Sequence, residues 1–149
     1  YLGWIARNFD ASADWDRLAW VRSLWPGPLI VKGILHPDDA ALAVQHGADA
    51  IVVSNHGGRQ LDGAISAVRA LPAIMDRLGG CVPVLADGGV RSGLDVLRFH
   101  ALGASAVMIG RPWVWALGAR GEAGVAHVLA LLRAELETAM ALTGRTRLA

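Results

Sequence analysis

The segment GADAIVVS at residues 47–54 returns in altered form as GASAVMIG at residues 103–110. A second matching pair precedes these two segments: PLIVKG at residues 28–33 and PVLADG at residues 83–88. The chain therefore contains two copies of a unit that carries two short apolar runs. An internal repeat of this length indicates an architecture in which equivalent units lie side by side.

The four apolar runs, at 29–32, 50–54, 84–87 and 106–110, contain many branched residues and do not alternate with polar ones. This pattern is typical of strands that are covered on both faces, as in a parallel sheet flanked by helices. We therefore predict four buried parallel strands.

Helix signals lie between these runs. Pro37 fits the first turn of a helix and Gly47 its end. Ser92 and Asp95 have the spacing of a capping box, and Gly103 marks the stop of that helix. The sequence therefore predicts a helix in each of the two repeat units, after the first strand of the unit.

Three further helices are predicted at about 14–24, at 65–78 and at about 122–142. The last has an apolar stripe, which we interpret as a face that packs on the core. The stripe consists of Val125, Val128, Leu129, Leu132, Leu136 and Met140.

Strand and helix thus alternate four times, which fits either an open doubly wound sheet or a barrel. Polar or glycine-rich sequence follows every strand, at 32–33, 54–60, 87–91 and 110–112. In a (β/α)8 barrel the active site lies at this end of the strands, and phosphate is usually held after the seventh and eighth. We predict an α/β fold: the C-terminal half of a TIM barrel, with strands five to eight and their helices.

Composition limits the function classes. The 149 residues are 54% hydrophobic and 18% charged, which excludes a disordered chain. The formal net charge of +1 gives no basic surface for nucleic acid. Cys81 is the single cysteine, so neither an intrachain disulfide nor a cysteine zinc site is expected, and no other metal site is predicted.

The first residues do not show the pattern of a signal peptide. Tyr1 opens the sequence without a signal peptide, and no apolar run reaches the ~18 residues of a spanning helix. We interpret residues 1–149 as a single-domain fragment cut from a longer protein, with 1–25 as a lead-in segment and helix. A cytoplasmic location is predicted.

The last two polar segments suit an anionic group. Gly88 and Gly89 permit close backbone approach to a phosphate, and Gly110 precedes a helix whose N–H groups would point at an anion. Arg91 and Arg111 add positive charge. The Gly-x-Gly-x-x-Gly order of a dinucleotide site is missing, which counts against NAD.

Four charged or titratable residues lie at the same predicted edge: Lys32, His56, Arg59 and Asp87. Each has an ordinary alternative. Lys32, expected to be buried, could pair with a carboxylate; His56 could cap a helix; Arg59 could be a surface residue; Asp87 could form a turn. Their common edge favours a site. His36, His46, His100 and His127 are predicted to be ordinary, and the tryptophans, including Trp4, Trp15, Trp20 and Trp25, to be packing residues.

At this point the motifs resemble those of a known family. SNHGGRQLD at 54–62, LIVKGIL at 29–35, DGGVR at 87–91 and IGR at 109–111 are similar to signatures of the FMN-dependent 2-hydroxy-acid dehydrogenases and oxidases. Three shorter segments most resemble the bacterial L-lactate dehydrogenases of that family, with mandelate dehydrogenase second; they are NFD at 8–10, DGAIS at 62–66 and MALTG at 140–144.

The resemblance implies a role for each matching residue. His56 would be the base that takes a proton from the substrate, Arg59 would bind the substrate carboxylate, and Lys32 would stabilise negative charge at N1 and the C2 carbonyl of FMN. The other implied cofactor contacts are Ser54 to the flavin, Asp87 to the ribityl chain, and Gly88, Gly89, Arg91, Gly110 and Arg111 around the phosphate.

The implied reaction is oxidation of an L-2-hydroxy acid, with L-lactate to pyruvate favoured and a quinone or cytochrome as acceptor. Mandelate dehydrogenase and an oxygen-using oxidase are the alternatives, followed by an inactive flavin-binding half-barrel. A relative of type 2 isopentenyl diphosphate isomerase or of inosine monophosphate dehydrogenase is disfavoured by the pairing of His56 with Arg59. The implied partners are the N-terminal half of the same barrel and further copies, as tetramers occur in the family. Peripheral attachment to the cytoplasmic face of the inner membrane stays open.

Overall fold

The computed structural model describes residues 3, 7, 10 and 12–148. Four parallel strands form one sheet in the order β1-β2-β3-β4. They are β1 (Ile30–Ile34), β2 (Ala50–Val53), β3 (Val84–Ala86) and β4 (Ala106–Val107). Each strand thus pairs with its neighbour in sequence, as in a barrel, whereas a doubly wound sheet reverses its order at a switch point.

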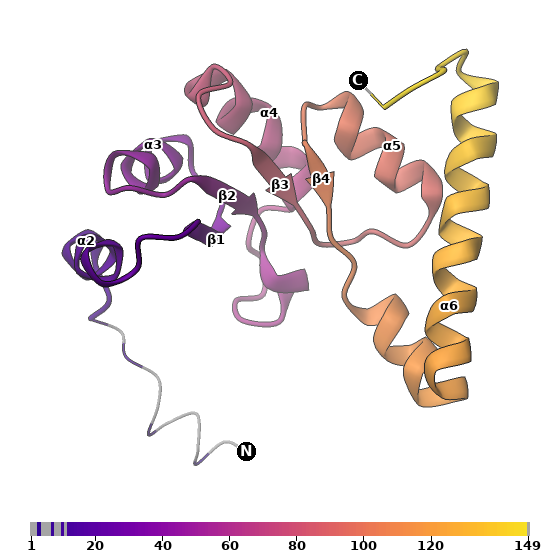
Figure 1. Ribbon diagram of the computed structural model, residues 1–149, viewed down its shortest axis with the longest axis horizontal. Helices are drawn as coiled ribbons and strands as arrows, with labels where there is room; N and C mark the ends of the chain where they lie inside the picture. The colour runs from indigo at the N-terminus through magenta and orange to yellow at the C-terminus, as the bar shows by residue number, and fades with distance from the viewer. Residues whose placement is uncertain (1–2, 4–6, 8–9, 11, 149) are drawn as a thin grey trace.

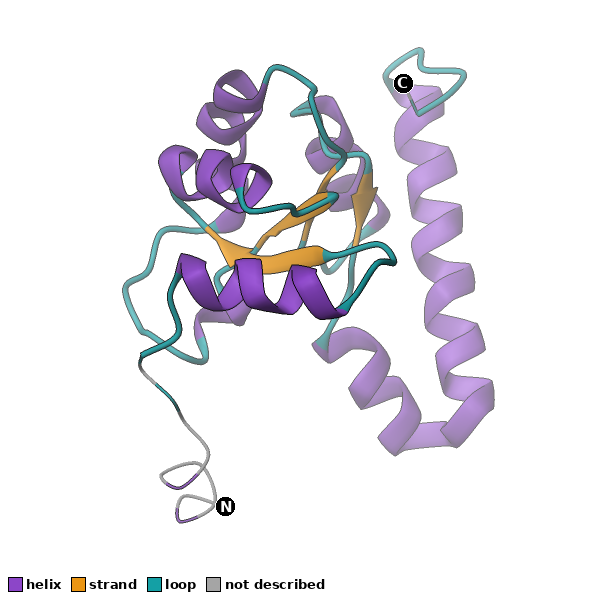
Figure 2. Cartoon of the chain, turned by 60° about the vertical axis from the view of Figure 1, so that its left-hand side comes forward, coloured by secondary structure: helices purple, strands orange, loops and turns teal. Residues whose placement is uncertain are grey.

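The helices form an outer arc around the strands, from α2 at one end to α6 at the other (Figure 1). Figure 2, from another side, shows α2 in front of the sheet and the long α6 at the far side. The helices are α2 (Trp15–Leu24), α3 (Pro37–Gln45), the short 3-10 helix η1 (His56–Gly58), α4 (Ala67–Leu78), α5 (Gly93–Ala101) and α6 (Arg111–Leu142). This is the α/β half-barrel that the sequence predicted.

Local caps explain where the helices begin. The side chain of Asp14 accepts a hydrogen bond from the backbone of Arg17 at the start of α2. Ser92 and Asp95 form the predicted capping box of α5, each side chain accepting from the other residue's backbone N–H. Because these signals are local, the predicted starts of both helices are confirmed.

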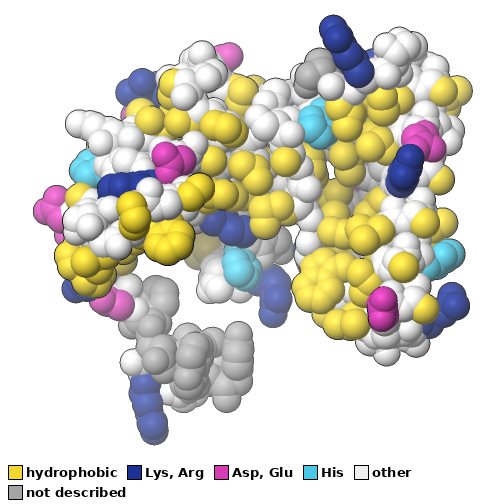
Figure 3. Space-filling view, viewed as in Figure 1, with side chains coloured by type: hydrophobic (Ala, Val, Ile, Leu, Met, Phe, Trp, Pro, Cys, Tyr) yellow, Lys and Arg dark blue, Asp and Glu magenta, His cyan; other side chains and the backbone are white. Residues whose placement is uncertain are grey.

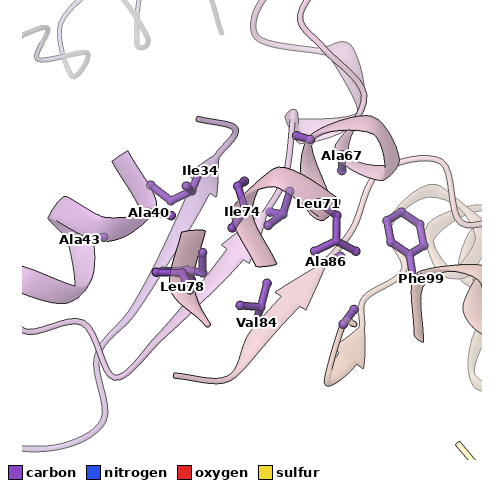
Figure 4. Packing of buried hydrophobic residues seen from close by; sticks show 14 of the residues in the cluster. Ile34, Ala40, Ala43, Ala67, Leu71, Ile74, Leu78, Val84, Ala86 and Phe99 are labelled. Carbon is purple, nitrogen blue, oxygen red and sulfur yellow. The ribbon is translucent and has the colours of Figure 1, made fainter. Parts of the chain in front are cut away.

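The core lies between the strands and the helices of the arc (Figure 4). Leu71, Ile74 and Leu78 of α4 pack in one cluster with Val84 of β3, and α3 contributes alanines to the same cluster. All four residues of β2 are buried, whereas the outer strands are partly open. The central strands are therefore the most buried part of the sheet.

Helix α6 is interrupted at Gly121, whose φ of 59° and ψ of −144° are not helical. The part after this break matches the helix predicted at about 122–142, and the part before it begins at Arg111, directly after Gly110, where a helix start was predicted. Val128 and Leu132, on the predicted stripe, are partly buried, but Leu129 is exposed, so its predicted packing is wrong for this chain. No described element covers that part of the helix.

The tryptophans also differ from the prediction. Trp15 is partly buried and its ring stacks on His46, but Trp20, Trp25 and Trp115 are exposed. Trp4 lies outside the described residues. Trp20 lies on α2, Trp25 caps the C-terminal end of α2, and Trp115 lies on α6. These helices stand at the two ends of the arc, where the described sheet ends at an unpaired strand.

Candidate active site

Every predicted site residue except Ser54 lines one cavity of about 190 Å³ at the C-terminal ends of the strands. Four segments meet there: Lys32 in the middle of β1, the loop of His56 and Arg59 after β2, Asp87 to Arg91 after β3, and the start of α6. Basic side chains and a histidine gather in the hollow at the middle of the face shown in Figure 3. The structure therefore brings together residues that are far apart in the sequence.

Lys32 and Asp87 form an ion pair inside this cavity. Lys32 Nζ lies 3.0 Å from Asp87 Oδ2 and donates to Ser54 Oγ at 2.9 Å. The Lys32 side chain is 38% exposed, so the prediction that it is buried is wrong, and the alternative that it pairs with a carboxylate is correct. The pair neutralises both charges but leaves the lysine open to the cavity.

The second oxygen of Asp87 is buried and has no hydrogen-bond partner in the described part of the chain. A buried carboxylate oxygen without a donor is costly, and in native proteins such groups usually meet a ligand or water. Because Asp87 also lines the cavity, Oδ1 is suited to accept a hydrogen bond from a hydroxyl group of a bound molecule.

The loop after β2 holds His56 and Arg59 at the cavity. Asn55 Oδ1 accepts from the backbone N–H of Gly57 at 2.9 Å, and the N–H of Gly58 donates to the carbonyl of Asn55 at 3.0 Å. These two bonds close a tight turn in which His56 precedes a glycine with φ of 67°. This turn directs the side chains of His56 and Arg59 toward the same cavity, which both of them line.

Ser54 is placed differently from its predicted role. It is 2% exposed and is not part of the cavity lining. Its hydroxyl oxygen accepts hydrogen bonds from Lys32 Nζ and from the backbone N–H of His56 at 3.1 Å. Ser54 therefore connects two of the predicted catalytic residues.

The start of α6 is suited to an anion. No side-chain cap accepts a hydrogen bond from the first backbone N–H groups of this helix. Its first two residues, Arg111 and Pro112, line the cavity. A Cβ placed on Gly89 or Gly110 would meet nothing within 4 Å, so the backbone there is open to close approach.

The start of α5, by contrast, is already occupied. Asp95 Oδ2 accepts from the N–H groups of Arg91 and Ser92, both at 3.1 Å, and Glu135 of α6 accepts from Gly93 at 2.8 Å. Burial alone would raise the pKa of Asp95, but hydrogen bonds from Arg91, Ser92 and Arg98 hold it below its usual value. The uncapped end of α6, and not that of α5, is thus the natural place for a phosphate.

The structure adds lining residues that the sequence reasoning did not single out, namely Gly57, Val90, Met108, Ile109, Pro112 and Trp115. Trp115 follows Arg111 by one helical turn, so helical spacing from the predicted phosphate residue could have identified it. Within the described residues, His, Cys, Asp and Glu form no group of three or more that could hold a metal ion. Among the same residues, no helix has both the length and the apolar character required to cross a bilayer.

Comparison with curated proteins gives close relatives. The chain is 58% identical over all 149 residues to L-lactate dehydrogenase of Stenotrophomonas maltophilia and, equally, to that of Pectobacterium atrosepticum. It spans 39% of the length of each of these relatives.

Solved structures resemble the fold closely. A mandelate oxidase variant with a monooxide FMN adduct matches 93% of this chain at a TM-score of 0.87 and 51% identity, over 44% of its own chain. Mandelate oxidase with benzoylformic acid matches 93% of this chain at a TM-score of 0.86, over 42% of its own. The family described as FMN-dependent dehydrogenase matches residues 2–149. With its fold, its motifs and nearly its whole length accounted for by that match, this chain belongs to the FMN-dependent dehydrogenases.

Proposed function

We propose that the whole protein uses FMN to oxidise L-2-hydroxy acids, with L-lactate to pyruvate as the preferred reaction and a quinone or cytochrome as electron acceptor. The observation that carries the proposal is the single cavity in which Lys32, His56 and Arg59 lie beside the glycine- and arginine-rich ends of β3 and β4. The similarity to L-lactate dehydrogenases supports the choice of substrate.

The residues of the cavity fit FMN. Asp87 Oδ1 offers a buried acceptor for a ribityl hydroxyl. The uncapped start of α6, the open backbone at Gly89 and the side chains of Arg91 and Arg111 suit a phosphate. Lys32 provides a positive charge one strand away from His56. Bound FMN would supply the capacity to accept two electrons from the substrate.

The other roles in the reaction fall to side chains of this cavity and to Ser54 behind it. His56 takes a proton from the 2-hydroxy acid, a step for which an imidazole open to the cavity is suited. Arg59 binds the substrate carboxylate through its planar pair of N–H groups, which fixes the orientation of the reacting carbon. Lys32 stabilises negative charge that develops beside it, and Ser54 holds Lys32 in place.

Completion of the barrel by the N-terminal half of the same protein is part of the proposal. β1 and β4 are the outer strands of the sheet, and Ile30 on β1 is 51% exposed. Open parallel edges and exposed apolar side chains require cover. The relatives, of which this chain spans 39%, have the necessary length. Assembly into tetramers, and a cytoplasmic location with peripheral attachment to the inner membrane, are further proposals that rest on the family resemblance.

Mandelate is the second candidate substrate, because the matching solved structures are of mandelate oxidase at 51% identity. L-lactate carries a methyl group where mandelate carries a phenyl group. The pocket for this substituent therefore decides which of the two substrates the protein prefers.

The test is anaerobic reduction of the flavin in the purified whole protein by L-lactate and, separately, by L-mandelate. We expect bleaching of the flavin absorbance by both, faster with L-lactate, and little hydrogen peroxide when air is admitted. Faster bleaching by mandelate would assign the second substrate, and efficient peroxide formation would assign an oxidase. A protein that binds FMN but is bleached by neither acid would overturn the proposal.

A further inference from the structure

His56 has an unusual backbone conformation. Its φ is 54°, and it is the only non-glycine residue with a positive φ in the described part of the chain. A side chain in this left-handed region is disfavoured by contact with its own backbone, so the surrounding structure must hold it there. The residue proposed as the catalytic base thus depends on its neighbours for its position.

One side chain contacts the backbone of His56 directly. Ser54 Oγ accepts from the His56 N–H at 3.1 Å. The bonds of Asn55 hold the glycines that follow, and the Arg59 N–H reaches the His56 carbonyl at 3.4 Å. The Ser54 hydroxyl is therefore the side-chain contact that holds the backbone N–H of His56 in place.

The same hydroxyl oxygen also accepts from Lys32 Nζ at 2.9 Å. An ammonium group and a backbone N–H can only donate, and a hydroxyl oxygen has two acceptor positions. Both positions of Ser54 Oγ are thus filled, one by the ammonium and one by the base loop. Asp87 in turn holds Lys32 at 3.0 Å, so the position of the oxygen is fixed from β1 and β3 as well.

We propose that Ser54 is a positioning residue that ties Lys32 to the base loop and keeps His56 in its left-handed conformation. This inference rests on the proposed function for its kinetic consequence, but its structural content concerns only residues of this chain. A simple flavin contact would require Ser54 at the cavity surface, whereas Ser54 is 2% exposed and does not line the cavity.

The test replaces the acceptor in the whole protein. Ser54→Ala removes it, and Ser54→Cys keeps a similar volume with a weak acceptor, which provides a second variant if the first folds poorly. Ser54→Thr restores a hydroxyl. Ser105→Ala is the matched control, since Ser105 is exposed and precedes β4 at the opposite end of the sheet.

We expect Ser54→Ala and Ser54→Cys to keep their FMN while the rate of flavin reduction by L-lactate falls about 10- to 100-fold, the range that loss of reactant alignment produces. KM should change little, because Arg59 still binds the carboxylate. Ser54→Thr should recover much of the rate, and Ser105→Ala should match the wild type. A wild-type rate in Ser54→Ala, or a loss explained entirely by lost flavin, would overturn the inference.

A crystal structure of Ser54→Ala or Ser54→Cys provides a readout that does not depend on activity. We expect the φ of His56 to leave the left-handed region or the loop to be displaced. His56 unchanged near 54° would refute the positioning role even if activity fell. If the wild-type protein shows no reaction with hydroxy acids, the proposed function fails, and this structural comparison still decides the inference.

Discussion

The guanidinium of Arg111 reaches over the backbone of Gly57. Arg111 Nη2 donates to the Gly57 carbonyl at 3.4 Å, and a Cβ placed on Gly57 would lie 3.1 Å from the same nitrogen. The residue at the start of α6 thus touches the loop that carries His56. The proposed phosphate end of the site therefore contacts the residue that follows the proposed base, His56.

Removal of both cavity arginines, Arg91→Ala with Arg111→Ala, should give a colourless protein. Two charge-assisted contacts to a phosphate would be lost, each worth about 1.5–3 kcal/mol. The measurement is the ratio of flavin to protein absorbance after purification. Arg133→Ala is the control, because Arg133 is exposed and its partner among the described residues is Glu137 on α6. A double variant with one flavin per chain would place the phosphate elsewhere.

His56→Gln should reduce turnover by several orders of magnitude while FMN stays bound. Loss of a general base alone costs about 10²–10⁴-fold, and the substitution leaves in place the backbone carbonyl of Gly57 that Arg111 contacts. Stopped-flow reduction of the flavin by L-lactate measures the effect. Near-normal reduction would show that another group takes the proton.

Arg59→Lys should raise KM strongly and lower kcat as well. Lysine keeps the charge but lacks the planar pair of N–H groups that orients a carboxylate. Steady-state kinetics with L-lactate separate the two constants. If both stay near the wild-type values, Arg59 is only a surface residue at the rim of the cavity.

Asp95→Asn should lower the free energy of unfolding at neutral pH by about 0.3–1 kcal/mol, because it removes a negative charge from the first turn of α5. The pKa of Asp95 is depressed in the folded protein, so its carboxylate stabilises the fold above the unfolded pKa of about 4. That stabilisation disappears as the pH falls through the lower, folded pKa. Urea unfolding at several pH values should therefore show a wild-type advantage that shrinks in acid. Asp76→Asn, an exposed position on α4, should show no such trend.

Gly93→Ala should be severely destabilising, whereas Gly118→Ala should be tolerated. A Cβ on Gly93 would overlap the backbone of Leu132 and Leu136, so α5 and α6 would have to separate. A Cβ on Gly118, also in a helix, meets nothing within 4 Å. Thermal unfolding of the two variants compares them directly. Equal stability would mean that the two helices shift apart at little cost.

Much of this structure can be predicted from local sequence. The apolar runs of β2 and β3 and the capping box of Ser92 depend on neighbouring residues, and the structure confirms them. The end of β4 was missed because Met108 to Gly110 read as a continued strand, whereas the ladder with β3 stops at Val107.

Contacts between distant segments were beyond the sequence reasoning. No pattern indicates that Lys32 faces Asp87, or that Glu135 accepts from Gly93, since each depends on how elements pack. The exposed tryptophans have a different cause. Their apolar character predicts burial in the whole protein, and Trp20 and Trp115 lie on the helices at the ends of the arc.

Lys32 and Asp87 occupy equivalent positions of the two repeats, the fifth residue of PLIVKG and of PVLADG. Their ion pair therefore connects the same position in the two copies of the repeat. Had a duplication left the same charged residue in both copies, two like charges would lie about 3 Å apart and repel. The ion pair therefore requires the two repeats to differ at this position, and this difference makes the site asymmetric although two similar units build it.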